Sequence, residues 1–302
     1  MNNFFVSGAS GLLSINIFFK YYQNFNFTGA LHNKILDLGL KNVSLIKIDL
    51  FDKSQLIHLL KKTKPNYFFH NAALTNLELC EKNQDLCNKV NYELTKVIVD
   101  VCKDLNIKLI FLSSDQLYSG NQDSYKEDDI TSPINNYGKT KVLSEEYILK
   151  HLPDSIIIRT NFFGWGTSYR KSFSDRILEI QNIHNEVLSD VFFNPVYAGT
   201  LIDIIFKLIT INFNGIINVS SDEPISKYNL ANQLLSGFNI IKTIQPIKLD
   251  NLPKYVKRPK KMVLDNSKLI NILNLKSINI NDCIEKLKLD KKSGLANILK
   301  NI

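Results

Sequence analysis

Tyr137 and Lys141 stand four residues apart, a spacing that brings both side chains to one face of a helix. A free phenol has a pKa of about 10. A lysine ammonium beside it favours the tyrosinate and so makes the phenol a better proton donor. Ser114 adds a hydroxyl that can donate a hydrogen bond to an oxyanion. These residue types suit the protonation of a carbonyl oxygen while the carbonyl carbon accepts a hydride.

The Tyr-x-x-x-Lys pattern also occurs at Tyr92 and Lys96, so the pattern alone does not identify a site. Position separates the two pairs. Tyr137 begins a predicted helix, and Ser114 ends the apolar strand before it, where ligands of doubly wound parallel sheets bind. Tyr92 lies inside a predicted long helix over 85–105. We therefore assign the Tyr137 pair and Ser114 to catalysis and the Tyr92 pair to the surface, although each residue type is also common in structural roles.

A glycine-rich turn, Ser7-Gly8-Ala9-Ser10-Gly11-Leu12-Leu13-Ser14, joins the first predicted strand to the first predicted helix. Glycine can adopt a positive φ there and lets the backbone approach a pyrophosphate closely. The N-terminus of the helix presents N–H groups to such an anion. An ordinary strand-to-helix turn is the alternative interpretation. The predicted dinucleotide contacts in this turn are Gly8, Ser10, Gly11, Leu12 and Leu13.

The end of the second predicted strand favours NADP(H) over NAD(H). An acidic residue there would bind the 2′-hydroxyl of the adenosine ribose in an NAD enzyme. The chain carries no acid at this point and has His32 and Lys34, which could face a 2′-phosphate or could be ordinary loop residues. Asp49 and Leu50 end the third predicted strand, where the carboxylate could accept a hydrogen bond from the adenine amino group.

Short apolar strands alternate with amphipathic helices through residue 160. The predicted strands cover residues 3–7, 25–31, 43–50, 66–73, 108–114 and 155–160, and the predicted helices cover 12–23, 53–62, 85–105 and 136–152. The alternation predicts an α/β fold with a Rossmann-type doubly wound parallel sheet. Prolines interrupt this rhythm further on. We expect a dinucleotide-binding domain over 1–160 and a smaller, partly interleaved C-terminal substrate lobe over 161–302, with segments that return to the first domain.

Composition and charge restrict the class of protein. With 44% hydrophobic and 22% charged residues, the 302-residue chain has a globular composition that excludes disorder. The net charge of +8 comes from scattered lysines with one dense stretch at 254–261, and we attribute most of it to coding bias rather than to a polyanionic ligand such as nucleic acid or a phosphorylated small molecule. We therefore expect no nucleic-acid partner. We find no membrane-spanning run and no signal peptide. Four cysteines without CxxC or nearby histidines predict a cytoplasmic protein with no metal site.

The order of the motifs resembles the extended short-chain dehydrogenase/reductase superfamily along the whole chain. The residues that carry this resemblance are Gly8-Ala9-Ser10-Gly11, Asn71-Ala72-Ala73, Ser114, Tyr137 and Lys141. Further segments are similar to the dTDP-4-dehydrorhamnose reductase branch. They are His70–Thr75, Cys80-Glu81, Val90-Asn91, Ser113–Gly120, Arg159–Gly164, Arg258-Pro259, Leu264-Asp265 and Lys268-Leu269.

The resemblance implies NAD(P)H-dependent reduction of the 4-keto group of a nucleotide-diphospho-6-deoxy sugar. Tyr137 would be the general acid, Lys141 would tune it and hold the nicotinamide ribose, and Ser114 would polarise the carbonyl. The implied further cofactor contacts are Asn71, Ala72, Ala73, Tyr137 and Lys141. The implied substrate contacts are Thr75, Ser114, Tyr118, Asn161, Phe162 and Arg258, of which the last could instead be a solvated residue. The resemblance also allows a homodimer.

Two departures from the superfamily's patterns bear on the reaction. Gln116 stands where nucleotide-sugar 4,6-dehydratases carry a glutamate, which disfavours dehydration. Asn161-Phe162 stands where the reductase branch often has a Ser-Trp pair, so the identity of the sugar stays open. Two alternatives remain beside the reductase: a nucleotide-sugar 4-epimerase, which reuses the tyrosine and lysine, and a non-catalytic dinucleotide-binding regulatory subunit.

Overall fold

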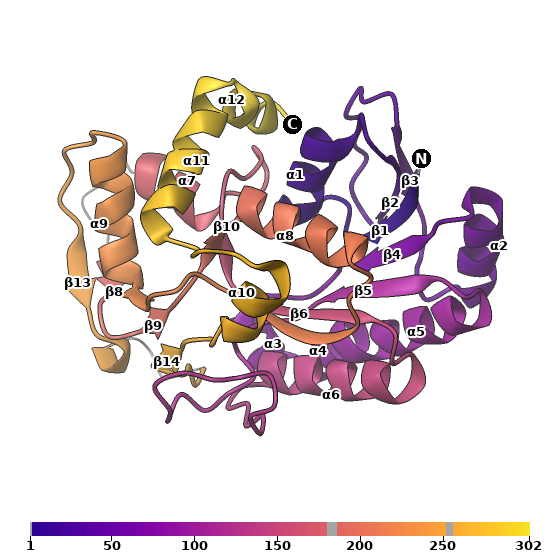
Figure 1. The fold of residues 1–302 in the computed structure, drawn as a ribbon, viewed down its shortest axis with the longest axis horizontal. Coiled ribbons are helices and arrows are strands. Elements are labelled where there is room, and N and C mark those ends of the chain that lie inside the picture. Colours follow the sequence, from indigo (N-terminus) through magenta and orange to yellow (C-terminus); the bar gives the residue numbers. More distant parts are fainter. Residues whose placement is uncertain (1, 180–185, 252–255) are drawn as a thin grey trace. The chain divides into compact units, whose positions relative to one another are not determined.

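A computed structural model describes residues 2–179, 186–251 and 256–302 (Figure 1). The chain divides into two compact units that interleave along the sequence. Unit 1 comprises Met1–Ser113, Asn135–Ile158 and Asn212–Ile216. Unit 2 comprises Ser114–Ile134, Arg159–Ile211 and Ile217–Ile302. The predicted division of roles at residue 160 stays a prediction, because compactness does not test what each part binds.

Unit 1 is built on a parallel sheet, as the alternating pattern predicted. Its strands are β1 (Asn3–Ser7), β2 (Asn26–Leu31), β3 (Val43–Lys47), β4 (Tyr67–His70), β5 (Lys108–Leu112), and the first parts of β6 (Ile156–Thr160) and β11 (Gly215–Val219). Its helical segments are α1 (Leu12–Tyr21), α2 (Lys53–Thr63), α3 (Leu77–Lys82), α4 (Gln84–Asn88), the π-helix η1 (Lys89–Glu93), α5 (Leu94–Asp104) and α6 (Asn136–His151). The seven strands run in the order β11-β6-β5-β4-β1-β2-β3, and the pairs from β6 to β3 are all parallel. The predicted α/β fold with a doubly wound sheet is confirmed.

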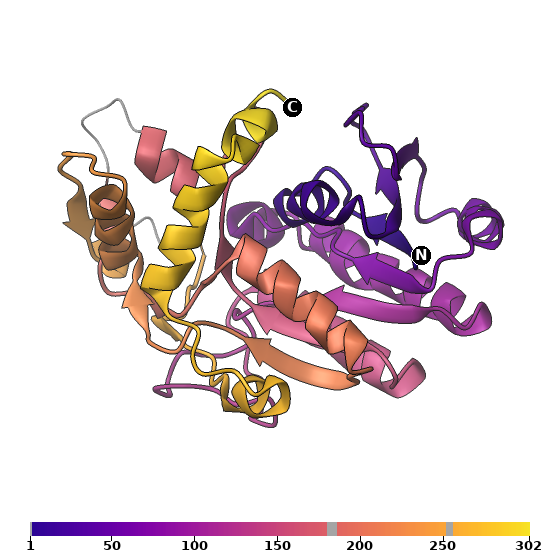
Figure 2. The ribbon, with the colours of Figure 1, turned by 45° about the horizontal axis from the view of Figure 1, so that its top comes forward.

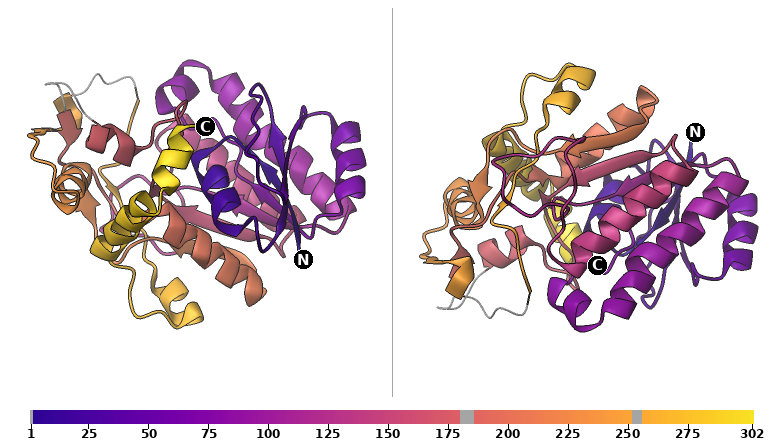
Figure 3. Two further views of the ribbon diagram at one scale, coloured as in Figure 1. Left: turned by 90° about the horizontal axis from the view of Figure 1, so that it is seen from above. Right: turned by 90° about the horizontal axis from the view of Figure 1, so that it is seen from below.

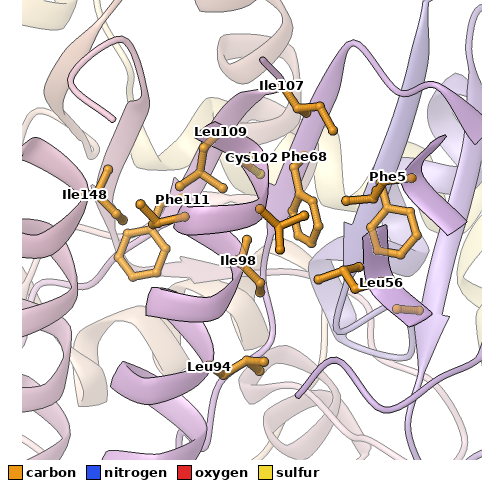
Figure 4. Packing of buried hydrophobic residues seen from close by; sticks show 14 of the residues in the cluster. Phe5, Leu56, Phe68, Leu94, Ile98, Cys102, Ile107, Leu109, Phe111 and Ile148 are labelled. Carbon is orange, nitrogen blue, oxygen red and sulfur yellow. The ribbon is translucent and has the colours of Figure 1, made fainter. Parts of the chain in front are cut away.

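Apolar side chains fix α2, α5 and α6 to one face of this sheet. Phe5 of β1, Phe68 of β4 and Leu109 of β5 stand in register on neighbouring strands, and all three are fully buried (Figure 4). Figure 3 shows α5 and α6 side by side across this face. Helix α1 lies on the opposite face (Figure 2). Its Phe18 packs against Phe27 of β2. Each such buried side chain contributes about 1.5–3 kcal/mol of hydrophobic stabilisation, which holds the strand ends in place.

The long helix predicted over 85–105 is present as contiguous helical segments over 84–104, but its middle is the π-helix η1, between α4 and α5, which was not predicted. The reason lies in Asn91, whose carbonyl oxygen accepts hydrogen bonds from Thr95 Oγ1 at 2.6 Å and Ser144 Oγ at 3.0 Å. Its side chain accepts from Leu74 N at 2.7 Å and donates to Leu74 O at 3.1 Å. The π-helical turn thus directs the Asn91 side chain inward, where its hydrogen bonds to Leu74 hold the loop that follows β4.

Unit 2 holds short strands and helices. Besides the last residues of β6 and β11, they are β7 (Phe162–Phe163), α7 (Phe173–Glu179), β8 (Glu186–Leu188), β9 (Phe192–Phe193), β10 (Val196–Tyr197), α8 (Ala198–Thr210), β12 (Ile225–Ser226), α9 (Lys227–Gly237), β13 (Gln245–Ile247), the 3-10 helix η2 (Leu249–Asn251), β14 (Lys261–Met262), α10 (Ser267–Leu273), α11 (Ile280–Lys292) and α12 (Leu295–Lys300). Its strands form the small sheets β10-β7, β12-β9-β14 and β13-β8. In the described parts of the chain, no helix combines the length and apolar character needed to cross a membrane.

Candidate active site

The glycine-rich turn after β1 is a tight backbone cradle. Gly8 has a φ of +66°, and a Cβ there would lie 2.8 Å from the backbone nitrogen of Ala72. Gly11 N donates to Gly8 O at 2.8 Å, and a Cβ on Gly11 would lie 3.0 Å from that oxygen. Leu12 and Leu13 then form the first turn of α1. The predicted residues thus share one turn in which a side chain would collide at position 8 and be tightly packed at position 11. A turn of this kind lets the backbone approach a pyrophosphate closely.

A buried hydrogen-bond chain, which motif reading did not find, fixes the next strand end against this turn. Ser7 Oγ accepts from the backbone nitrogens of Asn71 at 3.1 Å and Ala72 at 3.2 Å. It also pairs with His70 Nδ1 at 2.7 Å, and His70 Nε2 pairs with Thr95 Oγ1 at 3.0 Å. Because Thr95 Oγ1 donates its proton onward to a backbone carbonyl, it accepts from Nε2–H. Nδ1 therefore accepts from the Ser7 hydroxyl.

The His70 ring is neutral in this setting. Burial lowers its pKa to about 3, and the charge of Lys141 acts in the same direction. Asn71 extends the connection, since its Nδ2 donates to Ser14 Oγ at 2.8 Å. Ser14 stands at the third small position of the glycine pattern. Its hydroxyl accepts this hydrogen bond, which a glycine at position 14 could not do. Ala73 continues the same loop, half-buried.

Tyr137 lies at the start of α6, which is fixed by two side-chain caps. Asn135 Oδ1 accepts from Gly138 N at 2.8 Å, and Glu81 Oε1 accepts from Asn136 N at 2.7 Å. The Tyr137 side chain is 9% exposed and packs in a cluster with Cys80 and Cys87, the buried thiols of α3 and α4. The helix start predicted at residue 136 is confirmed.

Lys141, one turn further along α6, is a buried amine. It is 2% exposed, and its Nζ donates to Leu112 O at 2.6 Å and lies 3.9 Å from the centre of the Phe111 ring. Burial lowers the pKa of Lys141 to about 7, while the charge of Glu145 opposes this shift. Lys141 therefore changes charge near neutral pH, in the range where a catalytic amine is useful.

The residues predicted for the adenosine end lie on the surface of unit 1. His32 and Lys34 are exposed in the loop after β2. Asp49 is exposed as well, and its Oδ1 accepts from Phe51 N at 3.0 Å, so one carboxylate oxygen is used within its own turn. Leu50 beside it is half-buried. Their contacts with a dinucleotide stay predictions.

Unit 2 contains Ser114 in a second polar cluster. Ser114 Oγ donates to Asp115 Oδ1 at 3.2 Å and accepts from Gln116 N at 3.2 Å. Asn161 Nδ2 donates to Asp115 Oδ2 at 2.7 Å. Asp115 is 2% exposed, and burial raises its pKa to about 6, against the opposing effects of these hydrogen bonds and the charge of Lys227. Ser114 and Asn161 were predicted as site residues, and the carboxylate of Asp115 that joins them was not.

The other predicted substrate residues occupy different settings. Tyr118 is fully buried, stacks on Tyr125 at 4.0 Å, donates to Lys126 O at 3.0 Å and accepts from Arg159 Nη1 at 2.6 Å. Phe162 lies half-buried in β7, also in unit 2. Tyr118 is thus held in a structural network, and its predicted contact with a sugar stays a prediction.

Two further predicted substrate residues lie outside helices and strands. Thr75 is exposed in unit 1, in the loop after β4, and Arg258 is half-buried in unit 2. The dense lysine stretch predicted at 254–261 begins outside the described residues. The predicted roles of Thr75 and Arg258 stay predictions.

Comparison with known proteins gives a family match over nearly the whole chain. The model of the RmlD substrate binding domain family matches residues 2–288. The chain is 27% identical to dTDP-4-dehydrorhamnose reductase of Aggregatibacter actinomycetemcomitans, covering 74% of this chain and 80% of that protein. It is 23% identical to methionine adenosyltransferase 2 subunit beta of Mus musculus, covering 87% and 80%. The crystal structure of dTDP-4-dehydrorhamnose reductase from Bacillus anthracis in complex with NADP shares its fold, with a TM-score of 0.82, 20% identity, and coverage of 96% of this chain and 100% of that one.

Proposed function

The chain belongs to the RmlD substrate binding domain family, and from this premise we propose that it reduces the 4-keto group of a nucleotide-diphospho-6-deoxy sugar with NADPH. The observation that carries the proposal is the pair of buried side chains on α6, a tyrosine at its start and a lysine whose pKa lies near 7. The similarity to a dTDP-4-dehydrorhamnose reductase supports the substrate class.

The residues of unit 1 fit a dinucleotide. A Cβ on Gly8 or Gly11 would fill the cradle, and the N-terminus of α1 follows it directly. Ser10, Leu12 and Leu13 would hold the pyrophosphate, with Asn71, Ala72 and Ala73 along the next strand end. Asp49 and Leu50 would meet the adenine, and His32 and Lys34 would meet a 2′-phosphate, which favours NADPH. When bound, the reduced nicotinamide supplies the hydride.

Tyr137 would donate the phenol proton to the carbonyl oxygen, so its O–H bond breaks as the product hydroxyl forms. The Lys141 ammonium would stabilise the tyrosinate that remains. Ser114 would donate a hydrogen bond to the developing oxyanion, which requires its hydroxyl to leave Asp115. Gln116 offers no carboxylate for elimination of water. The residue at this position therefore favours reduction over dehydration.

The proposal also covers contacts with the rest of the substrate. Thr75 of unit 1 and Tyr118, Asn161 and Phe162 of unit 2 would border the sugar. Arg258 would meet the diphosphate, because a guanidinium fork suits phosphate oxygens.

The test is a panel of nucleotide-linked 4-keto-6-deoxy sugars, followed by NADPH and NADH absorbance. We expect stoichiometric NADPH oxidation and a product hydroxyl at C4 with at least one member. Interconversion of 4-epimers with no net NADPH consumption would instead establish a 4-epimerase. Absence of either reaction across the panel would contradict both enzymatic assignments.

A second candidate is a dinucleotide-binding regulatory subunit. It is favoured by the similarity to methionine adenosyltransferase 2 subunit beta, which spans 87% of this chain. This role would need the glycine turn but not the Tyr137 proton. Undiminished cellular function of a Tyr137→Phe chain would support it over the reductase.

A further inference from the structure

We propose that Glu145 is a positioning residue for the reduction: its buried carboxylate keeps Lys141 in the ammonium form and holds Ser113 at the end of β5. The inference rests on the proposed function and deepens it, since it adds a residue outside the Tyr-x-x-x-Lys pattern. Tyr137, Lys141 and Glu145 follow one another at intervals of four residues and so lie along one face of α6.

The Glu145 carboxylate is buried in unit 1 and hydrogen-bonded there. Its side chain is 3% exposed, and its Oε1 accepts a hydrogen bond from Ser113 Oγ. Ser113 is anchored on its other side, because its backbone nitrogen donates to Ile158 O of β6 at 2.8 Å. A buried charge destabilises a fold unless it is paired and hydrogen-bonded. One turn earlier on α6, Lys141 carries an opposite charge on which Glu145 acts.

The groups around Lys141 favour or oppose its charge in identifiable ways. β5 supplies the Leu112 carbonyl and the Phe111 ring, which do not titrate. β4 supplies His70, whose pKa of about 3 leaves it neutral. Burial lowers the pKa of Lys141 to about 7, and Glu145 on α6 raises it. Glu145 is thus the charge that sustains the ammonium against its loss of solvation.

The direction of the pH effect follows. Lys141 is charged below its pKa and neutral above it, so the reduction loses rate as the pH rises through that value. Without the carboxylate of Glu145, the ammonium is less favoured, and the same loss of rate begins at lower pH. A neutral Lys141 leaves the tyrosinate of Tyr137 without a counter-charge after proton donation.

The experiment is the pH profile of kcat for Glu145→Gln, with NADPH and the accepted 4-keto sugar nucleotide. Glutamine keeps the size of the side chain and an oxygen that can accept from Ser113, and it removes the charge. We expect the alkaline limb of the profile to move to lower pH by about one unit, which is about a tenfold loss of rate on that limb. An alkaline limb at the wild-type position would overturn the proposal.

Two matched variants separate charge from structure. Glu146→Gln removes the same charge from the neighbouring exposed position, and its profile should coincide with the wild type. Glu145→Asp keeps the charge but shortens the reach to Ser113, so its rate should fall while the limb stays in place. If the glutamine variant does not fold, the aspartate variant still tests the charge, because a limb that moves although the charge is kept would overturn the proposal.

A measurement without turnover keeps this proposal distinct from the proposed function. The full chain labelled with ¹³C at the lysine ε-carbons is titrated by NMR, and Lys141→Met identifies the Lys141 signal. We expect a lower titration midpoint for Lys141 in Glu145→Gln than in the wild type. If the wild type oxidises no NADPH with any sugar nucleotide, the reductase assignment fails, and this midpoint still decides the role of Glu145. Equal midpoints would overturn it.

Discussion

The Ser7–His70 hydrogen-bond chain beside the turn after β1 in unit 1 and the Ser114 cluster in unit 2 are both polar and buried, but they are built in opposite ways. The first joins neutral groups: the Ser7 hydroxyl, two backbone N–H groups, and a His70 ring that burial keeps uncharged. The second is built around a carboxylate, Asp115, whose pKa is raised to about 6. Neutral hydrogen bonds fix backbone geometry over a wide pH range. A buried acid with a raised pKa instead changes its charge close to neutral pH.

This difference separates two tasks that a reductase must combine. A neutral, backbone-defined cradle suits a cofactor that must bind in one pose. A titrating cluster next to a serine suits a place where charge develops and decays. Substitutions in the two regions test whether the chemistry and the stability of the protein divide along this line.

Replacing Tyr137 with phenylalanine tests whether unit 1 also supplies the proton. Loss of a positioned general acid lowers kcat by about 10²–10⁴-fold. Dinucleotide affinity, measured by fluorescence titration, should change little, because the cradle is untouched. Tyr92→Phe is the matched control, since it alters the second Tyr-x-x-x-Lys pair and should leave kcat unchanged. Equal rates for Tyr137→Phe and the wild type would remove the phenol from the mechanism.

Replacing Gly8 with alanine tests whether the cradle depends on backbone geometry. Gly39 is the matched position, because it also has a positive φ, of +63°, but a Cβ there would meet nothing within 4 Å. Alanine costs about 1 kcal/mol at either site for the left-handed backbone. At Gly8, the collision with the backbone of Ala72 adds about 1–3 kcal/mol.

Urea unfolding measures these costs, and dinucleotide titration measures the cradle. Only Gly8→Ala should lose affinity for NADPH. If both variants lose the same stability and keep the same affinity, close packing of the turn is not what prepares it for a dinucleotide.

The same contrast explains what the sequence could predict. The glycine turn and α6 depend on neighbours within a few residues, so their positions follow from local spacing, and the family resemblance drawn from them is confirmed. The π-helix around Asn91 was missed because its cause is contact with Leu74 and Ser144, the latter 53 residues away. Asp115 was missed because no local pattern reveals that a charged side chain will be buried.

Glu145 belongs with these missed residues. Its partner Ser113 lies 32 residues earlier in the chain, on another element. The interval of four after Lys141 was a usable signal, since it extends the helix face that carries the Tyr-x-x-x-Lys pattern. Only the burial of this carboxylate separates it from the exposed Glu146 beside it.

The smallest expected effect concerns Asp115 and the stability of unit 2. Its folded-state pKa of about 6 lies above the ordinary value of 3.8, so the folded state binds more protons between these limits and loses stability as the pH rises through them. From pH 4 to pH 7 the loss of stability amounts to about 2 kcal/mol.

Asp115→Asn removes the titration, so the wild-type free energy of unfolding minus that of the variant should fall by this amount over the same range. Urea unfolding at several pH values measures it, and Asn161→Ala should extend the fall to higher pH, because Asn161 lowers the pKa of Asp115. Parallel pH curves for the wild type and Asp115→Asn would mean that the unit 2 cluster is as insensitive to pH as the turn in unit 1.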